Sequence, residues 1–201
     1  MRLLLLLFFL SLFYSCETKD VEYAIVIHGG AGTILKKNMS DEMENAYIQK
    51  MEEAINAGYN ILEKNGSSID AVEATIKILE NSELFNAGKG SVLSNAGIVE
   101  MDASIMRGDN LNAGAISGVT TIKNPISAAR LVMEKSEHVF LSGKGAESFA
   151  KYENLQIIEN EYFITKRRLN SLRNAKKRDS LADNKYGTVG CVALDTDGNI
   201  T

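Results

Sequence analysis

A regular spacing of apolar residues over Asp41–Glu63 constrains the fold of this chain more than any other feature. Apolar side chains recur there every three or four residues, which predicts one long amphipathic helix that ends near Asn65 and Gly66. The run before it, over 21–27, is short, apolar and β-rich, and it leads into His28 and two glycines. This run predicts a strand followed by a tight turn. The chain therefore starts as strand, turn and helix, which indicates a mixed α/β protein.

Capping residues predict where further helices begin. Ser67, Ser68 and Asp70 are suited to cap a second helix. Pro125 stands at a favoured first-turn position for a third helix, and 143–152 has the pattern of a shorter one. The helices are thus spread along the chain between strand-forming segments.

Two hairpins are predicted. Strands within 91–103 would flank a turn at 95–97, and a strand over 189–194 is followed by a turn at 195–198 and a returning segment, 199–201. That returning strand stops within its first residues, which would leave an open sheet edge. We therefore expect the protein to continue beyond this segment.

Composition bounds the class of protein. The 201 residues are 45% hydrophobic with a net charge of -4, which suits a globular chain with one sizeable core and no broad nucleic-acid surface. Basic residues crowd the segment 165–185, so a nucleic-acid patch is one hypothesis. The overall acidity and the lack of interleaved aromatics favour the other, a solvated and mobile basic linker over 166–187.

The N-terminus has the pattern of an export signal. Met1 and Arg2 are followed by an apolar run that ends at Ser15 and Cys16, and this run is short for a membrane span. Ser15-Cys16 resembles a bacterial lipoprotein processing site. We expect residues 1–16 to direct export and Cys16 to carry lipid, with a short polar tether over 17–22. The alternative is a conventional cleaved signal in which Cys16 is lost or incidental.

The two cysteines are not expected to pair. A lipidated Cys16 leaves Cys191 without a partner, so no intramolecular disulfide is predicted even in an oxidising compartment. Cys191 lies within an apolar strand and is predicted to be a small core residue. The expected location is the bacterial periplasm or cell envelope, with contact to the membrane only through the lipid.

Thr188 is the residue that most constrains the chemistry. It lies in Gly187-Thr188-Val189-Gly190, between the basic stretch and an apolar strand. If the Gly187–Thr188 bond is cut, the new α-amine lies within reach of the threonine hydroxyl and can act as its base. The alternative is an ordinary junction of loop and strand, since short motifs often match by chance.

Six motifs in a fixed order give this chain a family resemblance from about residue 23 to its end. It resembles the plant-type asparaginases, or isoaspartyl peptidases, which are N-terminal-nucleophile hydrolases. Any one of the motifs would be unremarkable by itself. The motifs are His28-Gly29-Gly30-Ala31-Gly32-Thr33-Ile34, Phe85-Asn86-Ala87-Gly88-Lys89-Gly90-Ser91, Val99-Glu100-Met101-Asp102-Ala103-Ser104-Ile105-Met106, Ala113-Gly114-Ala115, Lys123-Asn124-Pro125-Ile126 and Gly187-Thr188-Val189-Gly190.

The resemblance implies a four-layer αββα sandwich that is incomplete in this chain. It also implies self-cleavage between Gly187 and Thr188, which separates an α-subunit with its core over 23–165 from a β-subunit that starts over 188–201. Mobility of the linker would let the scissile peptide strain and the released end depart. The family's second threonine and its substrate-binding Arg and Asp would follow beyond Thr201. The 201 residues alone are therefore expected to be poorly folded or inactive.

The implied reaction is hydrolysis of L-asparagine, or of the isopeptide bond of β-aspartyl dipeptides, with Thr188 as nucleophile and its own amine as base. Asn86 is implied to position that amine and the substrate; without the resemblance it would be an ordinary asparagine in a glycine-rich turn. No cofactor is implied for catalysis. A structural sodium ion would be held by backbone carbonyls of the loop residues Leu79, Glu80, Ser82, Phe85, Ala87 and Lys89.

Two further residues have alternative interpretations. His28 could contribute to an oxyanion site, but a lone histidine is favoured as a hydrogen-bonded structural residue, and the glycines after it as places of close backbone approach. Asp102 could be a catalytic carboxylate, but an organising role in its loop is favoured. The partners implied are small-molecule substrates and a second αβ unit in a dimer. Alternative functions are a glycosylasparaginase and an inactive lipid-anchored binding protein.

Overall fold

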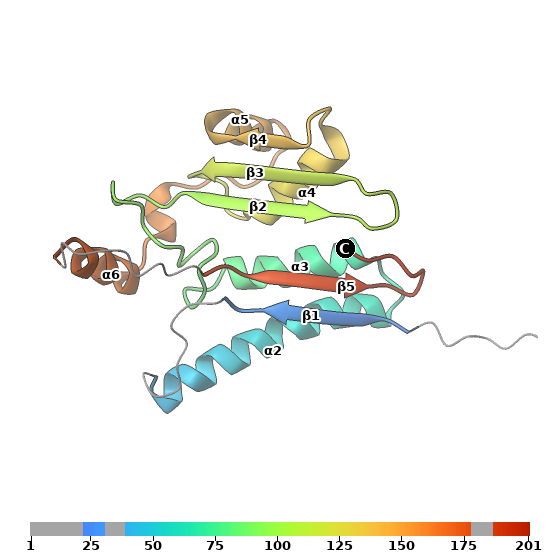
Figure 1. Cartoon of the computed structure of the whole chain (residues 1–201), viewed down its shortest axis with the longest axis horizontal. Helices are drawn as coiled ribbons and strands as arrows, with labels where there is room; N and C mark the ends of the chain where they lie inside the picture. Colours follow the sequence, from blue (N-terminus) through green and yellow to red (C-terminus); the bar gives the residue numbers. More distant parts are fainter. Residues whose placement is uncertain (1–21, 31–38, 178–186) are drawn as a thin grey trace, which may run out of the picture.

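Helices are spread along the chain between strands, as the sequence predicts. The computed structural model describes residues 22–30, 39–177 and 187–201. Figure 1 shows the arrangement of its elements. In chain order they are β1 (Ala24–His28), α2 (Asp41–Glu63), α3 (Ser68–Glu80), β2 (Met101–Met106), β3 (Ala113–Val119), α4 (Pro125–Lys135), β4 (Phe140–Ser142), α5 (Gly143–Tyr152), the 3₁₀ helix η2 (Asn160–Phe163), α6 (Lys166–Lys177) and β5 (Gly190–Leu194).

The strands form two small sheets that lie side by side (Figure 1). β1 pairs antiparallel with β5, while β2 pairs antiparallel with β3 and β3 pairs parallel with β4. The segment 199–201 lies between them, because Thr201 and Ala193 exchange two hydrogen bonds of 3.0 Å and the carbonyl of Ile200 accepts from the N–H of Gly108 at 2.6 Å. The predicted turn and returning segment are therefore confirmed, and they connect β5 to the neighbouring sheet.

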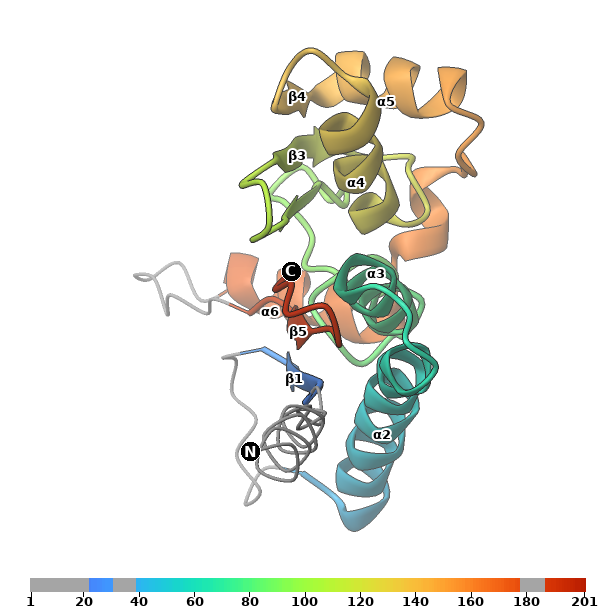
Figure 2. The same ribbon diagram turned by 90° about the vertical axis from the view of Figure 1, so that its right-hand side faces the viewer.

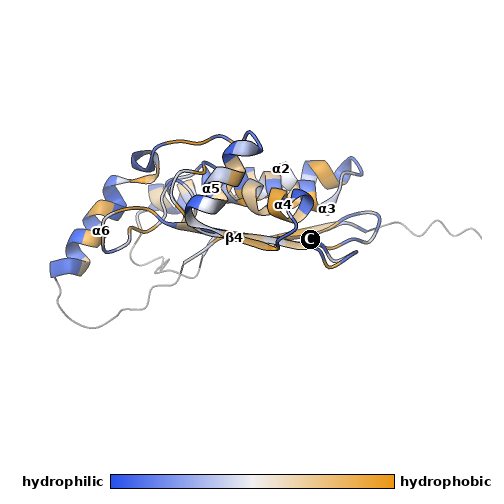
Figure 3. Ribbon diagram, turned by 90° about the horizontal axis from the view of Figure 1, so that it is seen from above, coloured by the Kyte–Doolittle hydropathy of each residue, from blue (hydrophilic) through white to orange (hydrophobic). Residues whose placement is uncertain are grey.

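Helices α2 to α5 cover one face of these strands (Figures 2 and 3). The opposite face carries apolar side chains: Val26 and Val192 are direct cross-strand partners and are 68% and 56% exposed. The predicted mixed α/β class is confirmed, and the described residues make two layers, one of helices and one of strands. The second pair of layers in the expected αββα sandwich stays a prediction.

The core has two parts. One lies between α2, α3 and the β1–β5 pair and includes the fully buried Leu62 and Leu79. The other lies between α4, α5 and the sheet β2–β4 and includes Val119 and Phe163, both fully buried. Burying one such large apolar side chain contributes about 1.5–3 kcal/mol, so these two clusters hold the helices on the sheet.

Local capping sets the helix boundaries at the predicted places. The hydroxyl of Ser40 accepts from the N–H of Met43 at 3.3 Å, and α2 starts at the next residue. The Ser67 hydroxyl accepts from the N–H of Asp70 at 3.3 Å and donates to its carboxylate at 2.6 Å. These two caps satisfy backbone donors that the first helical turns leave unpaired.

Three local predictions differ from the structure. The hairpin predicted over 91–103 is reduced to one isolated bridge between Leu93 and Val99, and β3 has no counterpart in the prediction. The segment 166–177, predicted as the first part of a linker, is the helix α6. One reason is local: the N–H of Arg168 donates to the hydroxyl of Thr165 at 3.2 Å, which caps the helix. The other is long-range, since Arg167 and Arg168 also donate to backbone carbonyls of the segment that follows α3. The rest of the predicted linker, 178–186, lies outside the described residues.

The N-terminal predictions fall outside the part of the chain that the structure describes. The export signal 1–16, the lipidated Cys16 and all but the last residue of the tether 17–22 are in this group. Within 22–30, 39–177 and 187–201, no helix combines the length and apolar character that a membrane span requires.

Candidate active site

The end of β1 lies against the backbone of Thr188. The two strands pair so that His28 faces Gly190, two residues beyond Thr188. Gly30 has a φ of +112°, and a Cβ at this position would lie 2.9 Å from the carbonyl oxygen of Thr188. Only glycine combines that conformation with so close an approach. The expectation that the glycines allow close contact beside Thr188 is thus met at Gly30.

Asn86 and Gly187 are 101 residues apart in sequence but in contact in the structure. The side-chain amide nitrogen of Asn86 donates a short hydrogen bond to the carbonyl oxygen of Gly187. Its amide oxygen accepts from the N–H of Val92 at 2.7 Å. Because both ends of the amide are bonded, the N–H group is held toward the peptide bond that joins Gly187 to Thr188.

The hydroxyl of Thr188 is accessible. The residue is exposed, and its Oγ1 approaches the carbonyl oxygen of Val189 at 3.5 Å, which is the outer limit of a hydrogen bond. The side chain is therefore not committed to a structural bond of ordinary strength. The sequence predicted Gly187, Thr188 and Asn86 as one site, and the structure brings these three residues together.

The loop that carries Asn86 is built around two glycines. Gly88 has a φ of +48° and Gly90 a φ of +116°, both in the region that favours glycine. A Cβ on Gly88 would lie 2.2 Å from the carbonyl oxygen of Glu80. The N–H of Lys89 donates to that same oxygen at 2.6 Å, and the N–H of Gly90 donates to the carbonyl of Phe163 at 3.2 Å. The loop therefore has little freedom to shift around Asn86.

The six residues whose carbonyls were expected to bind sodium lie at the C-terminal end of α3 and in the loop that follows it. A Cβ on Gly90 would lie 2.9 Å from the carbonyl oxygen of Phe85, so the carbonyls of Glu80 and Phe85 both crowd against the loop glycines. Oxygen ligands of this kind suit hard cations. Across the described ranges, no cluster of three or more His, Cys, Asp or Glu side chains is arranged to hold a metal. The donors that this segment can offer to a cation are thus backbone carbonyl oxygens, the donor type that the sodium prediction requires, and the ion itself stays a prediction.

Glu80 links this loop to α4. Its carboxylate accepts from the N–H of Ile126 at 2.9 Å and from the side-chain amide of Asn124 at 3.0 Å, so it caps the N-terminus of α4. Burial raises the pKa of Glu80 to about 8, although these two hydrogen bonds oppose the shift. The sequence resemblance assigned only the backbone carbonyl of Glu80, and it missed the role of the side chain.

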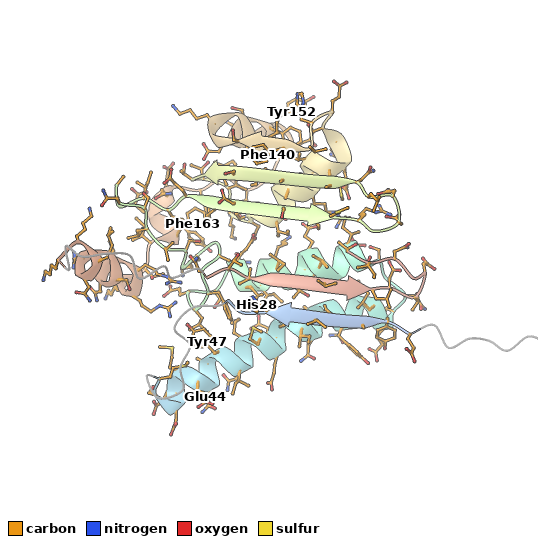
Figure 4. The ribbon with its side chains drawn as sticks, in the orientation of Figure 1. His28, Glu44, Tyr47, Phe140, Tyr152 and Phe163 are labelled. Atoms are coloured by element: carbon orange, nitrogen blue, oxygen red, sulfur yellow. The ribbon has the colours of Figure 1, made fainter. Side chains whose placement is uncertain are left out.

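Two arginines of α6 also contact the loop, and sequence reasoning missed both. Arg167 donates to the carbonyl oxygens of Glu83 and Leu84 at 2.8 and 2.7 Å, and Arg168 donates to the carbonyl of Gly90 at 2.5 Å. Arg167 also donates to the hydroxyl of Tyr47, and Figure 4 shows Tyr47 on α2 and His28 at the end of β1, on the side of the molecule where α6 lies. The one available signal was the capping threonine just before the basic segment, which indicates a helix start.

The remaining candidates lie apart from this chemistry or outside the described residues. Asp102 accepts from the N–H of Gly118 at 2.8 Å, which agrees with an organising role between β2 and β3. His28 is exposed, and its ring makes no hydrogen bond within the described ranges, so the expected structural partner is not found. Burial raises the pKa of the half-buried Cys191 thiol to about 11, in keeping with a packed residue. Residues 31–34 of the first motif are not described.

Fold and site define the class: a mixed α/β protein with a threonine two residues before strand β5 and an asparagine amide that donates to the carbonyl of the preceding glycine. A family model described as Asparaginase matches residues 21–201, and the chain belongs to this asparaginase family. This family is the one that the six sequence motifs resemble, the asparaginases of the N-terminal-nucleophile hydrolases.

Curated relatives point the same way. The chain is 45% identical over 185 residues to an isoaspartyl peptidase/L-asparaginase of Rattus norvegicus, covering 90% of this chain and 54% of the relative. It is 44% identical over 179 residues to a protein of that name from Xenopus laevis, covering 88% and 56%. It is 41% identical over 186 residues to an isoaspartyl peptidase of Escherichia coli, covering 88% and 58%. The chain thus spans little more than half the length of these relatives.

Proposed function

We propose that the protein hydrolyses β-aspartyl dipeptides and L-asparagine with Thr188, after the chain cuts itself before that residue. The observation that carries this proposal is the hydrogen bond from the Asn86 amide to the carbonyl oxygen of Gly187, next to an accessible Thr188 hydroxyl. The names of the relatives supply the substrate class. They favour this reaction over the glycosylasparaginase alternative.

Self-cleavage begins when the Thr188 hydroxyl oxygen attacks the carbonyl carbon of Gly187 and loses its proton to a base or water. Negative charge develops on the carbonyl oxygen, where the Asn86 N–H already donates. Collapse breaks the peptide C–N bond, protonates the nitrogen and leaves an ester between Gly187 and the Thr188 oxygen. Water then hydrolyses the ester, which frees the carboxylate of Gly187 and the α-amine of Thr188.

Turnover uses the amine that self-cleavage releases. The amine takes the hydroxyl proton as the Thr188 oxygen attacks the side-chain carbonyl of the substrate, and later gives a proton to the leaving ammonia or amine. Water hydrolyses the resulting ester to aspartate and restores Thr188. Once the carboxylate of Gly187 has left, the side-chain N–H of Asn86 is free to donate a hydrogen bond to the new α-amine of Thr188 or to the substrate.

We also propose a structural sodium ion on the loop. The carbonyls of Leu79, Glu80, Ser82, Phe85, Ala87 and Lys89 would hold it. Bound there, the ion would supply no reacting group and would brace the segment that carries Asn86.

Export, anchoring and assembly complete the proposal. Residues 1–16 would direct export to the bacterial envelope, and Cys16 would carry the lipid. The change Cys16→Ser should then release the protein from the membrane fraction and remove the lipid mass from the mature N-terminus. A dimer of αβ units would give, in sedimentation, twice the mass of one cleaved chain.

The test of the reaction is an assay of the full-length protein with a β-aspartyl dipeptide and with L-asparagine. We expect release of the free amino acid and of ammonia, and no turnover by Thr188→Ala. An α-aspartyl dipeptide is the control for the isopeptide bond, and a glycosylated asparagine tests the alternative reaction. Turnover by Thr188→Ala equal to that of the wild type would contradict the proposal. A folded wild type without turnover would favour the binding-protein alternative.

A further inference from the structure

The two ends of the Asn86 loop are fixed by α6. On the N-terminal side of Asn86, the guanidinium of Arg167 donates to the carbonyl oxygens of Glu83 and Leu84 at 2.8 and 2.7 Å. On the C-terminal side, the Nε of Arg168 donates to the carbonyl oxygen of Gly90 at 2.5 Å. Neighbouring residues of one helix therefore hold the loop on both sides of Asn86.

Tyr47 of α2 completes the N-terminal contact. Its hydroxyl donates to the carbonyl of Leu84 at 2.8 Å and accepts from Arg167 at 2.8 Å. Its ring meets that of the buried Phe85 edge to face, with 5.5 Å between centroids. Phe85 directly precedes Asn86, so the position of the amide is coupled to this network.

Neither arginine contact is an ion pair, because Arg167 and Arg168 both donate to uncharged oxygens. Arg167 donates to three oxygens at once, two from one guanidinium nitrogen and one from the other, and a lysine ammonium lacks this fork of fixed donors. Arg168 is half-buried, and burial lowers the pKa of its guanidinium. A desolvated donor makes a stronger bond to a neutral carbonyl than an exposed one does.

We propose that Arg167 and Arg168 are positioning residues for self-cleavage: they lock the loop so that the Asn86 amide meets the Gly187 carbonyl. This inference rests on the proposed function. It makes the docking of α6 a condition for cutting the bond between Gly187 and Thr188, which lies beyond the end of α6 at Lys177. Cleavage would then wait until α6 and the loop have folded against each other.

The test is a double-mutant cycle on the self-cleavage rate, followed by mass spectrometry. Arg168→Met should slow cleavage at least tenfold, and Arg168→Lys should slow it less. In the Asn86→Ala background, Arg168→Met should change the rate less than twofold, because the amide that it positions is absent. Arg173→Met, on an exposed residue of the same helix, is the matched control and should cleave at the wild-type rate.

Each outcome decides the inference. Equal slowing by Arg168→Met in both backgrounds would show a general structural effect and overturn it, as would a wild-type rate in Arg167→Met and Arg168→Met alike. Thermal melting of each variant separates unfolding from misplacement, and Arg168→Lys serves where the methionine variant does not fold. A wild type that never cleaves would instead contradict the proposed function itself.

Discussion

The two sides of the candidate site are held in different ways. On the loop side, residues 79–90, backbone carbonyls lie so close to the glycines that a Cβ on Gly88 would come within 2.2 Å of one. On the strand side, residues 187–190, the chain depends on backbone pairing with β1, and a Cβ on Gly190 would meet its nearest atom at 3.8 Å. The first side is crowded at Gly88, whereas the second has room at Gly190. Among the described glycines, only Gly30 approaches the second side closely, since a Cβ there would lie 2.9 Å from the carbonyl oxygen of Thr188.

The difference follows from what each side does in the proposed reaction. The loop side presents one amide N–H that must already be in place when charge develops on the Gly187 oxygen. The strand side contains the bond that strains, breaks and releases a new chain end. The donor is therefore held rigidly, while the peptide bond opposite it must be able to strain and break. We expect substitutions on the loop side to have larger effects than substitutions on the strand side.

The largest effect is expected from Asn86→Ala, which removes the donor. Losing one preorganised donor to a developing oxyanion costs about 10²–10³ in rate, so self-cleavage should slow by about that factor. Intact-mass time courses measure the rate. Asn95→Ala, an exposed turn asparagine, is the control and should behave as the wild type. Cleavage of Asn86→Ala at the wild-type rate would remove the loop side from the mechanism.

Gly88→Ala should break the loop side without touching the strand side. Its positive φ and the 2.2 Å approach to the Glu80 carbonyl combine backbone strain with overpacking, for about 3 kcal/mol lost from the free energy of unfolding. Gly190→Ala is the matched change on the strand side and should cost less than about 0.5 kcal/mol. Urea denaturation of both variants gives the comparison. Equal losses would mean that the two sides do not differ in crowding.

Glu80 should make the loop side sensitive to pH. Its pKa is raised from 4.5 to about 8 in the folded protein, so the folded state binds this proton more tightly than the unfolded state. The contribution of this proton to the free energy of unfolding is fully present below about pH 4.5 and is lost as the pH rises through about 8. The side chain in Glu80→Gln cannot ionise. Over this pH range, the free energy of unfolding of the variant should therefore change less than that of the wild type, and the two changes should differ by at least about 1 kcal/mol.

Denaturation at pH 5 and pH 8 measures this difference. The control is Glu161→Gln, a change at an exposed carboxylate, which should keep the wild-type dependence on pH. An unchanged profile in Glu80→Gln would show that another group carries the pH dependence.

The smallest effect is expected when sodium is replaced. If the loop carbonyls bind sodium with a Kd about tenfold below its concentration, the ion contributes about 1.4 kcal/mol, and an equal concentration of choline should lower the Tm by about 4 °C. Gly190→Ala should show the same shift because it leaves the loop intact. A Tm that does not depend on the cation would contradict a sodium site on the loop.

Much of this arrangement follows from local sequence patterns. The apolar spacing and the Ser40 cap define α2, and the Ser67 cap defines the start of α3, so both helices could be predicted. The site residues Thr188 and Asn86 depended on the order of six motifs, since neither the glycine loop nor the threonine junction is specific alone. The structure adds that these two motifs meet in space.

Other features depend on contacts that no local pattern contains. The basic composition of 166–177 favoured a linker, but Arg167 and Arg168 donate to carbonyls about 80 residues away, which gives the helix its place. The buried carboxylate of Glu80 is likewise explained only by Ile126, which is 46 residues away. Such long-range pairings decide whether a charged side chain is solvated or structural.

Intact-mass spectrometry of the full-length protein, incubated at neutral pH, tests the central claim most directly. The account predicts two fragments whose masses place the break between Gly187 and Thr188, with Thr188 as the new N-terminus. A single uncut chain that melts cooperatively would contradict the self-cleaving threonine, and with it the reaction proposed for this site.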